Sequence, residues 1–108
     1  MSPTPYLLVL TTAPGMESGQ AIARGLVEQR LAACVSVLPD ARSFYWWEGK
    51  LNAENECVLL IKTRADLFEP LEQGLKALHP YSVPELIALP VERGSADYLA
   101  WLDKETRG

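Results

Sequence analysis

The side chains best placed to do chemistry lie in the rigid segment 79–85, which reads His-Pro-Tyr-Ser-Val-Pro-Glu. Each proline fixes its own backbone and pushes the preceding residue toward extended geometry. Because few conformations remain, an imidazole, a phenol and a carboxylate are held at low entropic cost. The simpler interpretation is a stiff loop between a helix and a strand, with Tyr81 packed on the core.

His79 is the only histidine of the chain. A single imidazole holds a transition metal weakly unless other nitrogen or sulfur ligands join it. His79 also follows a helical pattern, and a histidine at a helix C-terminus commonly bonds the free carbonyl groups there. A weak metal ligand and a helix-terminal residue are therefore both open interpretations.

The two cysteines, Cys34 and Cys57, lie in apolar stretches and are expected to act as small hydrophobes. If the intervening hairpin folds about Lys50 and Leu51, Cys34 pairs near residue 67. Cys57 is then about ten residues away in register, or roughly 30 Å. A disulfide requires Cα atoms within about 7 Å, so none is expected.

An aromatic cluster, Tyr45, Trp46 and Trp47, ends the first strand of that hairpin. Alternation sends neighbouring side chains to opposite faces, and aromatic residues are enriched at subunit contacts. We therefore expect an interface, although a ligand platform is the alternative. The nearby charges Lys62 and Glu85 are either solvated surface groups or part of such a site.

The elements that position these residues follow from hydrophobic periodicity. Strands are expected over residues 6–12, 34–47, 54–63 and 86–91, with a turn over 48–53. Helices are expected over residues 16–31, over 66–78 with a capping box of Asp66 and Glu69 and a buried stripe, and near 95–102. That stripe consists of Leu67, Leu71, Leu75 and Leu78. Pro39 inside the second strand indicates an edge position or a bulge.

This order predicts one α+β domain over residues 1–108 with a ferredoxin-like split βαβ fold. Two main helices cover one face of an antiparallel sheet, the first and third strands are central, and a short helix ends the chain. The second strand is unusually long and aromatic for an edge strand. A bare edge of this kind invites association, so we expect it to pair with another copy of the chain.

The charge and hydrophobicity of the chain limit the classes of partner that it could bind. The net charge is −4 without a basic cluster, which argues against nucleic acid. No apolar run reaches the ~20 residues of a membrane span, and no basic leader begins the chain, so we expect a cytoplasmic protein that does not bind membranes.

Several motifs together resemble the CutA family of divalent-cation tolerance proteins. They are Arg-Leu-Ala-Ala-Cys at 30–34, Ser-Phe-Tyr-Trp-Trp-Glu-Gly-Lys at 43–50, the segment 79–85, Thr-Ala-Pro at 12–14, Ile-Lys-Thr at 61–63, and Gly94 with 97–102. The resemblance implies a homotrimer in which the long hairpin pairs with a neighbouring subunit, as in PII-type signalling proteins. From their positions we expect Trp47, Lys62, Tyr81 and Glu85 to line the clefts between the subunits of such a trimer.

Copper binding is credited to some bacterial members of that family, through a Cys closing the first strand and a His-His pair before Pro-Tyr. The matching positions here hold Thr11, Leu78 and His79. Only His79 keeps a ligand, so we expect any Cu(II) or other divalent-cation binding to be weak and no cofactor to be required.

The leading functional interpretation is a noncatalytic trimer of metal tolerance or small-ligand sensing. An acylphosphatase-like enzyme on the same fold is the alternative, but Pro14 removes a backbone donor from the loop that would cradle phosphate. An RNA-recognition module ranks last, because the strand Cys57-Val58-Leu59-Leu60-Ile61-Lys62 carries no stacking aromatics and the chain is acidic.

Overall fold

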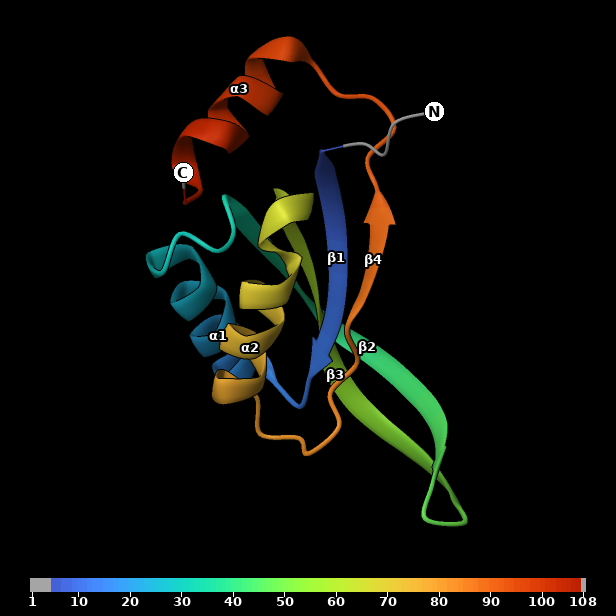
Figure 1. The fold of residues 1–108 in the computed structure, drawn as a ribbon. Coiled ribbons are helices and arrows are strands. Elements are labelled where there is room, and N and C mark those ends of the chain that lie inside the picture. The colour runs from blue at the N-terminus through green and yellow to red at the C-terminus, as the bar shows by residue number, and fades with distance from the viewer. Residues whose placement is uncertain (1–4, 108) are drawn as a thin grey trace.

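A computed structural model describes residues 5–107 and shows a four-stranded antiparallel sheet with strand order β2-β3-β1-β4 (Figure 1). The α+β ferredoxin-like fold is thus confirmed, with the first and third strands central and the second and fourth at the edges. The elements in chain order are β1 (Tyr6–Ala13), α1 (Met16–Glu28), β2 (Cys34–Trp47), β3 (Lys50–Arg64), a 3-10 turn (Ala65–Leu67), α2 (Phe68–Leu78), β4 (Ile87–Pro90) and α3 (Ala96–Glu105).

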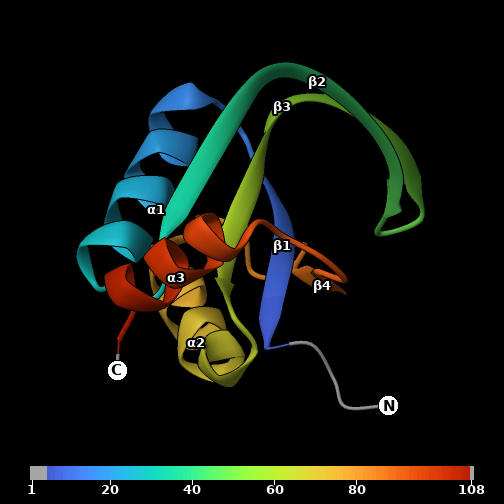
Figure 2. The same ribbon diagram turned by 90° about the horizontal axis from the view of Figure 1, so that it is seen from above.

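Helices α1 and α2 cover one face of the sheet, and the core lies between these two layers (Figures 1 and 2). Alternate residues of the central strands face the helices, as the two-residue period of a strand requires. The apolar stripes of both helices meet them there. The core residues include Val9, Ala13, Ile22, Leu26, Leu31, Cys57, Leu59, Ile61, Leu71 and Leu75.

The β2–β3 hairpin extends well beyond the helix-covered part of the sheet and curls away from it (Figure 2). Its turn is tighter than predicted, because β2 ends at Trp47 and β3 begins at Lys50. Glu48 and Gly49 have φ angles of 51° and 76°, as a two-residue type I′ turn requires.

The predicted register of this hairpin is therefore wrong. Cys34 pairs with Lys62 rather than near residue 67, since the chain reverses at residues 48–49. Cys57 is still about five residues away in register, or roughly 17 Å. The expectation of two free cysteines is confirmed.

Pro39 lies at an irregularity of the edge strand β2, as predicted. The pairing with β3 shifts between Leu38 and Ala41, and Asp40 adopts a φ of 64°. Such a bulge bends the strand and increases its twist. It therefore marks the point where the hairpin leaves the main sheet.

Helices α1 and α2 differ from the sequence prediction in three respects. Helix α1 ends at Glu28 instead of residue 31, because Arg30 takes a φ of 61° and turns the chain toward β2, although Leu31 remains in the core. The capping box of Asp66 and Glu69 does not form, since Asp66 binds Arg64. Leu78 is 39% exposed and packs its side chain beside Gly25 rather than in the central core.

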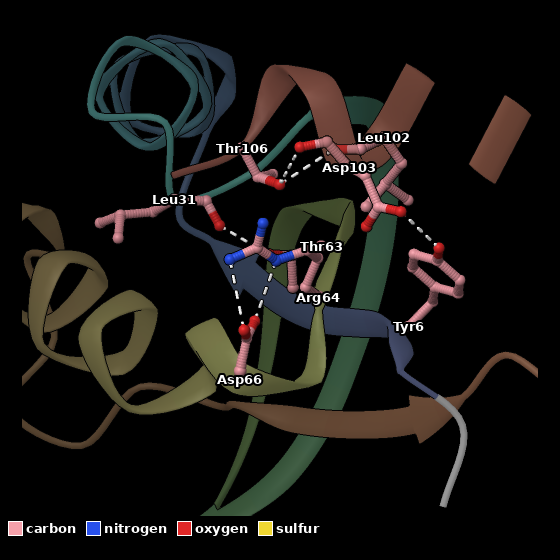
Figure 3. A network of polar contacts seen from close by, with 8 residues as sticks. All are labelled: Tyr6, Leu31, Thr63, Arg64, Asp66, Leu102, Asp103 and Thr106. Atoms are coloured by element: carbon pink, nitrogen blue, oxygen red, sulfur yellow. Dashed lines mark hydrogen bonds and ion pairs between the residues drawn. The ribbon is translucent and has the colours of Figure 1, made fainter. Parts of the chain in front are cut away.

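Helix α3 lies beyond the end of the sheet where β1 begins, held by a polar network (Figure 3). It starts as predicted, because the Ser95 hydroxyl accepts the Tyr98 N–H at 3.2 Å. The Tyr6 hydroxyl donates to Asp103 at 2.8 Å, and Arg30 pairs with Glu105 at 2.8 Å. The C-terminal helix is thereby fixed to two distant parts of the chain.

Candidate functional site

A cavity of about 670 Å³ opens where the β2–β3 hairpin leaves the sheet and meets the loop between α2 and β4. Its size suits a small ligand. It is lined by Thr12, Ser43, Phe44, Tyr45, Trp47, Glu56, Pro80, Tyr81, Ser82, Val83 and Glu85.

The loop that forms one wall is fixed to strand β1 at its beginning. The His79 Nε2 donates to the Thr12 carbonyl at 2.7 Å, because a carbonyl oxygen can only accept. The Nδ1 then accepts the Tyr81 N–H at 3.1 Å, so the ring is a neutral imidazole with its proton on Nε2. The rings of His79 and Tyr81 also lie 4.9 Å apart.

The end of the same loop is fixed by Thr11. Its hydroxyl donates to the Glu85 carbonyl at 2.6 Å, so consecutive residues of β1 hold both ends of segment 79–85. The two prolines remove most of the remaining freedom. The stiffness predicted from the sequence is therefore used to place the Tyr81 and Glu85 side chains at the cavity.

A phenol and a buried carboxylate meet on the inner wall. The Tyr81 hydroxyl donates to Glu56 Oε2 at 2.8 Å, and Glu56 is only 6% exposed. Burial, and then the hydrogen bond to Glu56, raise the pKa of the Tyr81 phenol. Tyr81 thus stays a neutral hydrogen-bond donor at physiological pH.

The second carboxylate of the cavity is Glu85. Burial raises the pKa of Glu85 above its ordinary value, and repulsion by Glu56 adds to the shift. The Glu56 carboxylate therefore disfavours the charged form of Glu85. Burial raises the pKa of the Tyr45 phenol in the same way, with Glu54 and Glu56 contributing.

Three of the four predicted cleft residues, Trp47, Tyr81 and Glu85, line this one cavity. Lys62 does not line it, because it lies farther along β3, where its Nζ donates to the Ser36 hydroxyl at 2.9 Å. Of the predicted interface residues, Tyr45 and Trp47 line the cavity, whereas Trp46 is 72% exposed.

Glu56 is the site residue that sequence reasoning missed. Its position held a signal, since the two-residue period of β3 puts Glu56 on the same face as Val58 and Leu60. A carboxylate in phase with apolar residues is more informative than one on a polar face.

Thr11, Leu78 and His79, the residues at the positions of the family's copper ligands, have structural roles in this chain. Thr11 and His79 hold the loop, as described above, and Leu78 packs beside Gly25. Residues 5–107 contain no group of three or more His, Cys, Asp or Glu side chains that could hold a metal ion. A metal ion at His79 would have to displace one of its two hydrogen bonds.

The fold and site together define a ferredoxin-like protein with a long hairpin and a ligand-sized cavity at the hairpin base. A family model described as CutA1 divalent ion tolerance protein matches residues 7–105. The chain belongs to this family, as the motifs of the sequence indicated.

Similar proteins support the same assignment. The chain is 46% identical over 99 residues to the divalent-cation tolerance protein CutA of Thermus thermophilus, covering 92% of this chain and 96% of that protein. It is 47% identical over 103 residues to the chloroplastic protein CutA of Arabidopsis thaliana, covering 95% of this chain but 57% of the plant protein. The crystal structure of CutA1 from Oryza sativa superposes with a TM-score of 0.93 at 44% identity, over 97% of this chain and 96% of that one.

The family model and the Thermus relative are named for tolerance of divalent cations and not for a reaction. Within the described residues, no helix has the length and apolar character needed to cross a membrane.

Proposed function

We propose that this chain is a noncatalytic homotrimeric protein of divalent-cation tolerance, in which the cavity at the hairpin base is a PII-like site for a small ligand. The tolerance function is taken from the names of its relatives. We propose a cytoplasmic location for this protein, whereas the Arabidopsis relative is named as chloroplastic.

The observation that carries the trimer is the exposure of the hairpin. Phe44 is 68% exposed and Trp46 72% exposed, on a strand that has a free edge in the single chain. Exposed aromatic residues on an edge strand are a liability unless another chain covers them. A neighbouring copy that pairs with this hairpin removes both the bare edge and the exposed rings.

Assembly also explains how Lys62 joins the other predicted cleft residues. Six residues of strand separate Lys62 from Glu56, or roughly 20 Å. Lys62 therefore reaches a cavity of this kind only from another copy. Trp47, Tyr81 and Glu85 supply the part of the cleft that belongs to a single chain.

Light scattering of the purified protein during dilution into the micromolar range tests the assembly. We expect a single species with three times the chain mass of 12.0 kDa that does not dissociate. A monodisperse species of one chain mass would contradict the proposal.

Metal binding is a separate part of the proposal, and we expect it to be weak and to depend on His79. Both ring nitrogens of His79 already take part in hydrogen bonds. A metal ion that binds one of these nitrogens therefore costs the protein that hydrogen bond. Titration calorimetry with Cu(II) and Zn(II) should show no submicromolar affinity, and His79→Ala should remove the binding that remains. Submicromolar affinity that survives His79→Ala and alkylation of both cysteines would refute this assignment.

A further inference from the structure

We propose that Lys62 of a neighbouring copy pairs with Glu56, so that an ion pair between subunits closes the cavity at the hairpin base. This inference rests on the proposed function, because it names the group that receives Lys62 in the assembly. Glu56 then joins two copies of the chain, besides accepting the hydrogen bond of Tyr81.

The carboxylate of Glu56 is buried, and residues 5–107 give it no counter-ion. It is only 6% exposed and forms no ion pair with any of these residues. Its Oε2 accepts the Tyr81 hydroxyl, whereas its Oε1 accepts no hydrogen bond from the described part of the chain. Buried carboxylates are rare unless a cation pairs with them. A cation is therefore expected at Oε1 once the cavity is complete.

The ammonium group of Lys62 is the matching cation. Among the described residues it donates to the Ser36 hydroxyl at 2.9 Å and to the Leu60 carbonyl at 3.3 Å, and it pairs with no carboxylate. An ammonium group has three N–H donors, so one is left for a further acceptor. The other basic residue of β3 over residues 57–64 is Arg64, which already pairs with Asp66 at 2.9 Å.

Glu56 and Lys62 share the face of β3 that is turned away from helices α1 and α2, because side chains alternate between the two faces of a strand (Figure 2). The pairing register places several apolar residues on the same face of the sheet, namely Leu38, Val58, Leu60, Ile87 and Leu89. Leu38 is 45% exposed and Ile87 52% exposed in the single chain. An exposed apolar face of this kind marks a contact with another molecule.

The two charges select a second copy of the chain as that molecule. Lys62 and Glu56 are six residues of strand apart, or roughly 20 Å, so they do not pair within one chain. In a cyclic trimer, one part of each copy contacts a different part of the next copy. The lysine end of this face in one copy therefore meets the glutamate end in the next, and every copy has both groups paired.

Glu85 is the other carboxylate of the cavity, but Glu56 is the better partner for Lys62. Glu85 is the more exposed of the two, so water stabilises its charge more than that of Glu56. A buried carboxylate also attracts an ammonium group more strongly, because less water screens the two charges. The pairing leaves Glu85, Trp47 and Tyr81 to contact a ligand.

Charge reversal in the full chain tests the pairing, with light scattering during dilution in a fixed concentration of urea as the measurement. Glu56→Lys and Lys62→Glu each place like charges at the contact, so each should raise the dissociation constant of the assembly at least about tenfold. The double variant with Glu56→Lys and Lys62→Glu should recover most of this loss. An equimolar mixture of the two single variants should assemble better than either alone, which a pair within one chain would not do.

Glu54→Lys is the matched control, because it makes the same change on the same face of β3 at a residue that does not line the cavity. It should not rescue Lys62→Glu. Circular dichroism shows whether each variant is folded. Where a reversed charge prevents folding, Glu56→Gln, Lys62→Gln and their combination give a second test. Their two losses should not add, because either change breaks the same pair.

Folded reversed variants that show no rescue, or neutral variants whose losses simply add, would overturn the inference. Rescue of Lys62→Glu by Glu85→Lys rather than by Glu56→Lys would overturn it as well, because Glu85 would then be the partner. In each of these cases a parent chain that remains a trimer leaves the proposed function standing. A parent chain that is a monomer would instead refute the proposed function.

Discussion

Strands β2 and β3 run through both the helix-covered part of the sheet and the hairpin beyond it, but the two parts differ in how their apolar side chains are used. In the inner part of β3, Cys57, Leu59 and Ile61 are buried against the helices. In the outer part, Leu51 is exposed, as are Phe44 and Trp46 on the opposite strand. The change occurs near the bulge at Pro39.

This difference shows that a single chain buries the apolar side chains of the inner half but not those of the outer half. The inner half has helices to cover it, and its stability is a property of the single chain. The outer half has none, so its hydrophobic stabilisation must come from another molecule. The cavity lies at the boundary, with one wall from each half.

The largest effect is expected in the inner half, at Leu26. This side chain is fully buried in α1, so Leu26→Ala should lower the free energy of unfolding by about 2 to 5 kcal/mol through lost burial and a cavity. Chemical denaturation measures it. The control Val27→Ala, at an exposed neighbour, should cost less than about 1 kcal/mol. Equal costs would show that the inner core is not the main source of stability.

In the outer half, Trp47→Ala separates the single chain from the assembly. Trp47 is 47% exposed in one chain. Truncation should therefore lower the stability of the assembly by about 3 to 5 kcal/mol, the cost for a buried aromatic residue, only if a neighbouring copy covers the ring. Light scattering measures dissociation of the assembly, and thermal unfolding at several protein concentrations measures the loss of stability. Trp101→Ala on α3, a tryptophan of similar exposure, should leave assembly unchanged. A Trp47→Ala trimer as stable as the parent would contradict the covered hairpin.

At the boundary, Tyr81→Phe removes only the hydroxyl that donates to Glu56. A hydrogen bond to a charged group contributes about 1.5 to 3 kcal/mol, so unfolding should become easier by roughly that amount while the fold persists. The control Tyr98→Phe removes a hydroxyl with no hydrogen bond to residues 5–107 and should be nearly neutral. A Tyr81→Phe chain that fails to fold would make Tyr81 a structural residue and argue against a cleft role.

The smallest effect is a pH dependence at Glu85. Its pKa in the folded chain lies above the ordinary 4.5, so the unfolded chain loses this proton at lower pH than the folded chain does. Between the two pKa values the folded state binds more protons, and stability falls as pH rises. Glu85→Gln should remove this decline and raise the melting temperature slightly near pH 7, as thermal unfolding across pH would show. Glu92→Gln, in the loop after β4, should leave the decline unchanged.

Local patterns predicted most elements correctly, and their errors have physical causes. The two-residue turn at Glu48 and Gly49 was placed too far along, because the sequence offers several turn-forming residues and only strand pairing selects one. The capping box failed because the Asp66 carboxylate binds Arg64, a charged neighbour that periodicity does not consider. Leu78 follows the helical stripe but lies at the last residue of α2, past the edge of the core.

The candidate site was predictable in part. Trp47, Tyr81 and Glu85 stood out by residue type and by rigid flanking prolines, and all three line the cavity. Glu56 was not singled out, because the hydrogen bond that joins it to the site comes from Tyr81, a residue 25 positions away along the chain. Lys62 was grouped with the site by its position, but in one chain its ammonium group donates to Ser36 and to the Leu60 carbonyl.

The amino-acid sequence by itself determined the order of the elements, the antiparallel fold and the stiffness of segment 79–85, because periodicity and proline act over a few neighbouring residues. Only the tertiary structure decided that Thr11 and His79 serve to hold that segment on β1, and that Glu56 is buried beside Tyr81. These features arise from groups far apart in the chain, and the burial that gives them their energies exists only once the chain is folded.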